Sequence, residues 1–242
     1  SLPMPQDVEK VSTGKDGIIE SVKPGTILLD ASTNSLSMVK KLHKIFDEKG
    51  VEFLDCPVSG GVIGAINKDM SIMVGGNEST YKKIKPVLDA MGDKAIYCGP
   101  VGSGTICKLS HQLFSGLLLG ITTEVLTSGV KAGMDLDTLI DAISRCASAK
   151  NPPFDNWKAS QEYNFEGDEM SFFLELAAKD IRLACEMARE NKVPLDMANI
   201  FEQNIIEAMN KGWGKKNSGI VRKIIADRAG VSLDYAPGGF SS

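Results

Sequence analysis

The stretch "GPVGSGTICKLSHQL", residues 99–113, separates two kinds of sequence pattern in this chain. It opens with three glycines, Gly99, Gly102 and Gly104. It then leads into a mostly apolar segment without proline, residues 105–132, which predicts one long helix. The stretch therefore marks the point at which one fold pattern gives way to another.

Upstream of this stretch, short apolar runs alternate with amphipathic segments. Continuous apolar runs of this length are typical of strands in a parallel sheet, and the segments between them have helical spacing. We expect strands within residues 26–30, 51–56, 70–76 and 95–99, and helices within residues 37–50 and 78–92. This strand–helix–strand order predicts an α/β domain with a parallel sheet.

Downstream of the glycines, the pattern is that of helices and loops only. After the long helix we expect helices at residues 135–148 and 170–192, then two or three more as far as Arg228. The sequence "NPPFDNW", residues 151–157, is expected to interrupt them. The fold class is therefore α/β followed by all-α, with an α/β domain at residues 1–102 and a helical domain at residues 103–242.

Composition excludes several classes of partner. The chain has 242 residues and a net charge of −4, so it lacks the basic surplus of a protein that binds nucleic acid or anionic lipid. No apolar run reaches the length of about 18 residues that spans a membrane. The five cysteines are scattered without a C-x-x-C, which favours reduced thiols and a cytoplasmic location. The two histidines have no metal-type spacing, so we expect no metal site.

Lys108 is the candidate catalytic residue. Lysines on helices are usually solvated, but the apolar neighbours of Lys108 predict a largely buried helix, in which an unpaired ammonium is costly. Partial burial lowers the pKa of a lysine, so that it can transfer a proton near neutral pH. Gln112 lies four residues further on and shares its helix face, where its amide can hold a substrate hydroxyl. We therefore predict that Lys108 and Gln112 form a catalytic pair.

Two loops follow expected strands at their carboxyl ends, where open parallel sheets bind ligands. Ser59, Gly60 and Gly61 offer a hydroxyl and two backbone N–H groups, which suit a carboxylate, although a flexible turn explains the same residues. The sequence "DAST", residues 30–33, offers two hydroxyls, but it also fits the N-cap of the next helix.

Two further features have simple structural interpretations. The glycines at residues 99–104 fit a turn that needs positive φ angles, or an opening that lets a ligand approach the helix start. Lys179 lies among apolar residues, and an ion pair with Asp180 or Glu175 is the simpler interpretation of it.

Taken together, these motifs resemble the β-hydroxyacid dehydrogenase family, which includes 3-hydroxyisobutyrate dehydrogenases and tartronate semialdehyde reductases. The matching motifs are "SLP", "DAST", "DCPVSGG", "MVGG", "GPVGSGTICK" and "AAKD". They occur in the family's order and at its spacings, and the resemblance covers essentially residues 1–230. It implies hydride transfer between NAD or NADP and a small hydroxy acid or its semialdehyde.

The resemblance also implies roles for particular residues. Lys108 would be the general acid/base, and Gln112 stands where the family usually has a catalytic asparagine. The substrate carboxylate would be bound by Ser59, Gly60 and Gly61, and the cofactor by Leu2, Pro3, Thr33 and Lys179. The long helix would link the two domains, and members of the family usually form homodimers or homotetramers through the helical domain.

The chain departs from the family pattern at several points. The family usually reads K-x-x-N-N where this chain has "KLSHQ"; the histidine is similar to the K-x-x-H-N of 6-phosphogluconate dehydrogenases, whose helical region is much longer. Lys68 and Asp69 replace a Gly-Thr that the family commonly has. The family also opens with a strand and G-x-G-x-x-G, which this chain lacks. We therefore expect the C-terminal half of a Rossmann-type sheet, with an exposed strand edge.

Two other functions stay open at this point. The chain fits a non-catalytic, oligomerising or binding fragment of the same fold that has lost cofactor binding, because the glycine fingerprint is absent. It also fits imine reduction on this fold, but those enzymes often lack the lysine, so Lys108 counts against that function. The choice between NAD and NADP depends on a residue outside this sequence.

Overall fold

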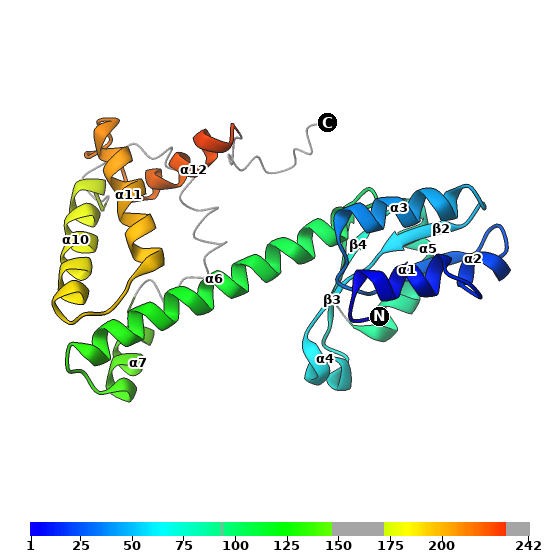
Figure 1. Cartoon of the computed structure of the whole chain (residues 1–242), viewed down its shortest axis with the longest axis horizontal. Coiled ribbons are helices and arrows are strands. Elements are labelled where there is room, and N and C mark those ends of the chain that lie inside the picture. The colour runs from blue at the N-terminus through cyan, green and yellow to red at the C-terminus, as the bar shows by residue number, and fades with distance from the viewer. Residues whose placement is uncertain (93, 147–171, 231–242) are drawn as a thin grey trace. The chain divides into compact units, whose positions relative to one another are not determined.

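The computed structural model describes residues 1–92, 94–146 and 172–230 (Figure 1). The chain forms two compact units, Ser1–Gly116 and Leu117–Ser242. Helix α6 (Ser103–Lys131) passes through this division, so its first half belongs to one unit and its second half to the other. The domain boundary expected at residue 102 lies directly before α6 and stays a prediction.

The first unit contains a five-stranded sheet and the helices packed against it. The strands are β1 (Ile27–Asp30), β2 (Glu52–Asp55), β3 (Val58–Ser59), β4 (Ser71–Gly75) and β5 (Lys94–Gly99). The helices, besides the start of α6, are α1 (Pro5–Thr13), α2 (Ile18–Ser21), α3 (Leu36–Asp47), α4 (Gly61–Asn67) and α5 (Glu78–Met91). The expected strands and the two expected helices are all present, which confirms the α/β class.

The sheet is mixed rather than wholly parallel. β1 pairs with β2 in parallel, and β4 pairs with β5 in parallel, as the sequence predicts. β4 is antiparallel to β3 and meets the end of β2 at the pair Asp55–Gly75. The connection from β3 to β4, residues 60–70, is shorter than the dozen or so residues that a parallel crossover needs. Among the described strands, β1 pairs only with β2. Within the described ranges, β1 is therefore an edge strand of the sheet.

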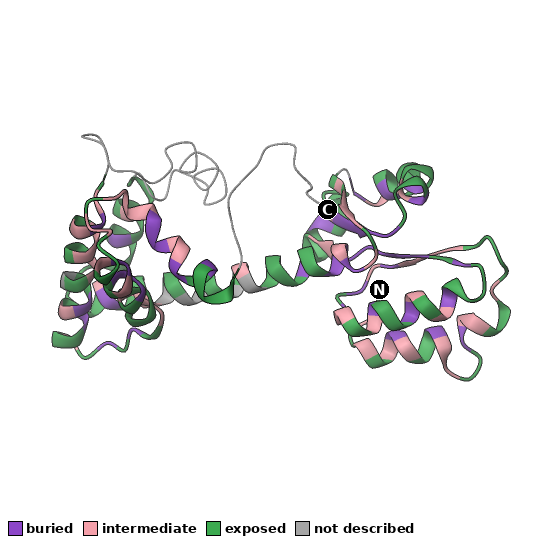
Figure 2. Cartoon of the chain, turned by 90° about the horizontal axis from the view of Figure 1, so that it is seen from above, coloured by how far each residue is buried: buried purple, intermediate pink, exposed green. Residues whose placement is uncertain are grey.

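The core of the first unit lies on both faces of the sheet. Neighbouring residues of a strand point to opposite faces. Phe53 of β2 belongs to a cluster with α1 and α3, whereas Leu54 belongs to a cluster with α5. Figure 2 marks these buried positions along the strands and the neighbouring helices. The helices therefore cover the two faces separately, and the strand ends stay available for other contacts.

Local capping explains where several helices begin. Ser35 Oγ accepts a hydrogen bond from Met38 N at 3.2 Å at the start of α3. The side chains of Asn77 and Asp135 do the same for α5 and for α7 (Leu136–Ser144). The predicted aspartate cap is thus confirmed, and the cap of α3 is Ser35 rather than a hydroxyl of "DAST".

Four short elements of the first unit were not expected from the sequence: α1, α2, β3 and α4. The residue before α1, Met4, makes no side-chain cap. α4 contains two glycines and β-branched side chains, which have low helix propensity. The sequence analysis assigned no helix or strand to these segments, although Pro5 at the first position of α1 is a common helix-start residue.

The second unit is helical in its described part, as expected. After α6 and α7 it contains α10 (Leu174–Glu190), α11 (Asp196–Asn210), the 3₁₀ helix η1 (Ser218–Val221) and α12 (Arg222–Ala229). Its main core cluster joins α10, α11, η1 and α12 around Leu174, Ile205 and Ile224. The break expected at residues 151–157 lies outside the described residues. Among the helices of the described ranges, none combines the length and apolar character needed to cross a membrane.

Candidate active site

The glycines before α6 are explained by backbone geometry. Gly99 and Gly102 have φ angles of 125° and 95°, which favour glycine. A Cβ on Gly104 would lie 2.3 Å from the carbonyl oxygen of Met73 and 2.6 Å from that of Asp55. The first turn of α6 therefore lies directly against the ends of β2 and β4. The interpretation as a turn with positive φ angles is confirmed for Gly99 and Gly102, whereas Gly104 is explained by its close approach to the strands.

The start of α6 is held by a carboxylate from another part of the chain. Asp55 Oδ1 accepts a hydrogen bond from Gly102 N at 2.8 Å, and its Oδ2 accepts one from Thr105 N at 2.7 Å. Asp55 is only 1% exposed. Gly102 stands at the N-cap position, because its carbonyl accepts the first hydrogen bond of the helix, from Ile106 N. As a glycine, it has no side chain that could cap the helix. Asp55 thus supplies the cap that the local sequence lacks.

Lys108 lies one turn further along α6 and is buried, with 7% of its surface exposed. No hydrogen bond or ion pair joins its ammonium to another residue of the described ranges. Burial lowers the pKa of Lys108 below its ordinary value of 10.5. The hydroxyl of Thr105, three residues earlier, is also buried and has no partner among the described residues. Buried polar groups without a partner are uncommon in native structures.

Gln112 lies one turn beyond Lys108 and is exposed. Its Oε1 is 3.1 Å from Nδ1 of His111, which is exposed too. The proposed catalytic pair therefore consists of one buried and one exposed side chain. The catalytic role of Gln112 stays a prediction.

The predicted carboxylate loop lies between β3 and α4. Ser59 is the last residue of β3 and pairs with Ser71 of β4, whereas Gly104 packs against Met73 and Gly75 further along the same strand. Gly60 and Gly61 are exposed and have φ angles of 139° and 61°. β4 thus connects this loop to the start of α6.

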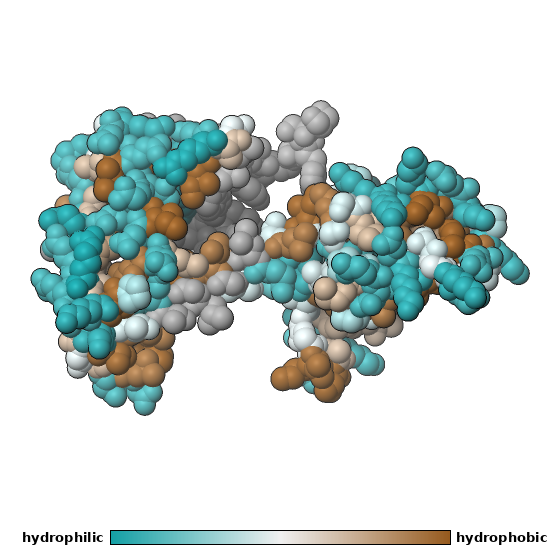
Figure 3. All heavy atoms as spheres, viewed as in Figure 1, coloured by the Kyte–Doolittle hydropathy of each residue, from teal (hydrophilic) through white to brown (hydrophobic). Residues whose placement is uncertain are grey.

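Helix α4 follows this loop directly and presents apolar side chains to solvent. Val62, Ile63 and Ile66 are each more than 70% exposed, and they give the hydrophobic surface at α4 in Figure 3.

The predicted cofactor residues of the first unit lie together at the carboxyl end of β1. Leu2 N donates a hydrogen bond to Ser32 Oγ at 2.9 Å, which joins "SLP" to "DAST". The turn after β1 is itself organised by Asp30, which accepts hydrogen bonds from Ser32 N and from the Asn34 side chain. Pro3 and Thr33 remain exposed beside it. Exposed side chains on an ordered turn at a strand end fit a nucleotide cofactor.

Lys179 belongs to α10 in the second unit. Its ammonium lies 3.2 Å from a carboxylate oxygen of Asp180, and both side chains are about half exposed. The ion pair expected from the sequence is therefore present with Asp180. Its role near a cofactor stays a prediction.

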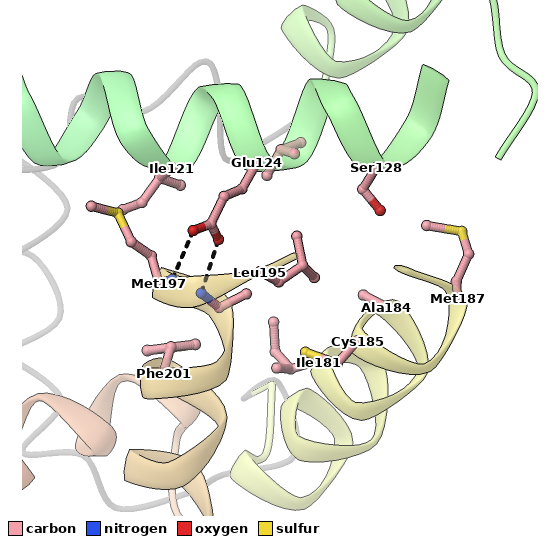
Figure 4. A pocket seen from close by; sticks show the side chains of 12 residues that line it. Ile121, Glu124, Ser128, Ile181, Ala184, Cys185, Met187, Leu195, Met197 and Phe201 are labelled. Carbon is pink, nitrogen blue, oxygen red and sulfur yellow. Dashed lines mark hydrogen bonds between the residues drawn. The ribbon is translucent and has the colours of Figure 1, made fainter. Parts of the chain in front are cut away.

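The second unit has an apolar cavity of about 450 Å³ between α6, α10 and α11 (Figure 4). Glu124 of α6 lies at its wall, and its two carboxylate oxygens accept hydrogen bonds from Met197 N at 2.7 Å and Ala198 N at 3.1 Å. These amides belong to the first turn of α11, whose N-cap residue, Leu195, makes no side-chain cap. A second helix is thus capped by a carboxylate that is distant in sequence.

Comparison with known proteins identifies the class to which this fold and site belong. Residues 1–99 match the profile of the NAD binding domain of 6-phosphogluconate dehydrogenase. Residues 102–224 match the profile described as NAD-binding of NADP-dependent 3-hydroxyisobutyrate dehydrogenase. The chain belongs to the β-hydroxyacid dehydrogenase family, whose members are NAD(P)-dependent oxidoreductases, and the cofactor is NAD or NADP.

Individual relatives agree with this family. The chain is 32% identical to 2-(hydroxymethyl)glutarate dehydrogenase of Eubacterium barkeri, over 96% of this chain and 77% of that protein. It is also 32% identical to mitochondrial 3-hydroxyisobutyrate dehydrogenase of Mus musculus, over 89% of this chain and 66% of that protein. The chain thus spans about two thirds to three quarters of the length of these relatives.

Solved structures share the fold. A 3-hydroxyisobutyrate dehydrogenase from Salmonella typhimurium matches with a TM-score of 0.54 and 26% identity, over 92% of this chain and 77% of that one. An imine reductase variant from Myxococcus stipitatus in complex with NAD+ matches with a TM-score of 0.79 over 93% of this chain and 78% of that one. The second match has 16% identity and therefore shows the fold alone.

Sequence reasoning missed Asp55 and Glu124. Asp55 is part of the motif "DCPVSGG", and a carboxylate that ends a buried apolar strand requires a partner. The position of Asp55 at the end of a buried strand is therefore the feature of the sequence that predicts a contact for its carboxylate. Nothing in the local sequence of Glu124 predicts its contact with α11.

Proposed function

We propose that this chain carries the acid/base and carboxylate-binding residues for hydride transfer between NAD(P) and a small hydroxy acid or its semialdehyde. The observation that carries the proposal is the buried Lys108, without a partner among the described residues and one turn inside a helix anchored to the sheet end. In oxidation, the neutral amine of Lys108 would take the proton of the substrate hydroxyl. In reduction, its ammonium would return a proton to the carbonyl oxygen.

The other residues of the site would bind and orient. Ser59, Gly60 and Gly61 would hold the substrate carboxylate through a hydroxyl and backbone N–H groups. The cofactor would be held by Leu2, Pro3, Thr33 and Lys179. The nicotinamide held there would supply the hydride-transfer chemistry. Gln112 would hold the substrate oxygen through its amide.

The direction of the pKa shift gives this proposal a pH dependence. Burial lowers the pKa of Lys108, so the neutral amine forms at lower pH than in an exposed lysine. For oxidation, kcat/KM should rise with pH until the lowered pKa is passed. For reduction, which needs the ammonium, kcat/KM should fall as pH rises through the same pKa.

The test is a turnover assay of the purified protein with NAD+ and NADP+ against a panel of small hydroxy acids. Lys108→Ala should lower turnover by at least about a hundredfold, the usual scale for a general acid/base. Lys108→Arg should be impaired as well, because a guanidinium keeps the charge but does not release its proton. Lys131→Ala, which removes an exposed lysine of the same helix, is the matched control.

Two results would count against the proposal. Full turnover by Lys108→Ala would remove the acid/base role. A folded wild-type protein that turns over no hydroxy acid with either cofactor would favour the alternative, a non-catalytic oligomerising or binding fragment of the same fold.

We also propose that the protein forms homodimers or homotetramers through its helical part in the cytoplasm. Support comes from apolar side chains of α6 that are exposed in the second unit, among them Leu117, Leu118 and Val125. Exposed apolar side chains that form a contiguous patch are typical of interaction sites. The free thiols fit a reducing compartment. Molar mass from light scattering tests the assembly, and a monomer at micromolar concentration would contradict it.

A further inference from the structure

Asp55 is a buried carboxylate whose charge is balanced by backbone amides. No Lys or Arg pairs with it within the described ranges, and its two oxygens instead take the amides of Gly102 and Thr105. The positive end of the dipole of a 29-residue helix adds to this stabilisation. The carboxylate thus accepts two amides of the helix start, and within the described ranges its side chain has no other hydrogen-bond partner.

The space around this contact leaves little freedom. A Cβ on Gly75 would lie 2.4 Å from Asp55 Oδ1, and one on Gly102 would lie 2.7 Å from Leu36 Cδ1. Glycine at these positions lets the strand ends and the helix start approach so closely. Any change in the length or hydrogen bonding of Asp55 must therefore move the first turn of α6.

Lys108 depends on that first turn for its position. It lies three residues after Thr105, which is about 4.5 Å along the helix. Residues at this spacing share a helix face, and both side chains are buried. A displacement of about 1 Å in a reacting group can cost about a hundredfold in rate.

We propose that Asp55 is the positioning residue of the active site, which fixes Lys108 by anchoring the start of α6 to the end of β2. This inference rests on the proposed function of Lys108 as the acid/base. Asp55 also precedes the carboxylate loop by only four residues, so one side chain holds the acid/base helix against the strand that leads to Ser59.

The test is Asp55→Asn in the full chain. Asparagine has nearly the same shape, but its NH₂ group would face one of the two amide donors. We expect kcat to fall by about 10- to 100-fold with a smaller change in KM. If the helix start loosens, water reaches Lys108 and its pKa rises toward that of an ordinary lysine. The part of the pH profile of kcat/KM that reports the titration of Lys108 should therefore move to higher pH.

Glu124→Gln is the matched control, because it makes the same chemical change at the cap of α11. Its pH profile should stay that of the wild type. If Asp55→Asn reduces kcat only in proportion to the folded fraction, with an unchanged pH profile, Asp55 is merely structural and the inference is wrong. A shift of the limb to lower pH would also overturn it, since that is the effect of removing a nearby negative charge.

Asp55→Glu provides the test if Asp55→Asn does not fold. It keeps the charge and both acceptor oxygens but moves them by one methylene, so kcat should fall although the protein is folded; wild-type kcat would contradict the inference. Lys108→Ala separates the two hypotheses. If Lys108→Ala remains active, the proposed function fails; if it is inactive while both Asp55 variants behave as the wild type, only the positioning role fails.

Discussion

Within the described ranges, two carboxylates cap helices that are distant in sequence, one in each unit. Asp55 caps α6 from 47 and 50 residues away, and Glu124 caps α11 from 73 and 74 residues away. In both helices the N-cap residue, Gly102 or Leu195, has no side chain that can do so. The two contacts differ in their surroundings: Asp55 is 1% exposed between the end of β2 and the start of α6, whereas Glu124 is half-buried at the wall of an apolar cavity.

This difference shows how the same hydrogen-bond pattern serves two purposes. A half-buried carboxylate on two amides stabilises a helix junction, and water can replace part of the interaction. Water cannot reach a fully buried carboxylate to replace its hydrogen bonds. Such a contact therefore fixes the position of the helix start as well as stabilising the fold. The unit that carries Lys108 contains the fully buried contact, that of Asp55.

The largest expected contrast is in thiol reactivity, because a buried cysteine lies at each contact. Burial, followed by the charges of Asp55 and Asp30, raises the pKa of Cys56 to about 12. From the ordinary value of 9.0, the fraction of reactive thiolate falls about a thousandfold. Cys185, at the wall of the cavity, has a pKa raised by burial and then by Glu202. Alkylation followed by mass spectrometry should label the exposed Cys107 and Cys146 first and Cys56 last. Early labelling of Cys56 would show that its environment opens.

The next contrast uses glycines of α6. Gly104→Ala would place a methyl group against the backbone oxygens of Met73 and Asp55, which cannot move aside, and should cost about 3 kcal/mol in the free energy of unfolding. Gly129→Ala meets only the end of the Leu139 side chain, so its effect should stay within about 1 kcal/mol. Urea unfolding followed by circular dichroism measures both. Equal costs would mean that α6 does not lie tightly against the strands.

Neutralising the two carboxylates compares the contacts directly. Asp55→Asn should lower the free energy of unfolding by about 2 kcal/mol, because a buried amide loses its acceptor. Glu124→Gln should cost about 1 kcal/mol, the usual value of a helix cap. Hydrogen exchange should quicken at Gly102 and Thr105 in the first variant, and at Met197 and Ala198 in the second. Exchange that quickens at the other helix instead would show that the contacts are not independent.

The smallest expected effect concerns the charge of Lys108 itself. Its pKa is lowered in the folded protein, so between that lowered pKa and 10.5 the unfolded state binds more protons, and stability rises with pH. Lys108→Met should therefore stabilise the fold near neutral pH, by up to about 1 kcal/mol, and lose this advantage as pH approaches 10.5. Unfolding curves at several pH values test this, and a methionine variant that is less stable at neutral pH would contradict the cost of the buried charge.

Much of the molecule follows from the sequence by local rules. The strands and helices of the βαβ units, the long helix and the cap at Asp135 are set by apolar periodicity and by residues three positions apart. The buried lysine in an apolar helix start likewise predicted the candidate acid/base. The antiparallel pairing of β4 was not predicted, because strand direction depends on how the connection through α4 turns.

The sequence by itself thus determined the order of elements, the family resemblance and the candidate residues Lys108, Ser59, Gly60 and Gly61. Only the tertiary structure decided the contacts that hold the start of α6, which are the cap by Asp55 and the close approach at Gly104. In the other unit it decided the cap that Glu124 gives to α11. The physical reason is the range of the interactions. A side chain that caps its own helix acts over three residues and can be seen in the sequence, whereas Asp55 acts over about fifty and becomes a cap only when the folded sheet brings it to the helix.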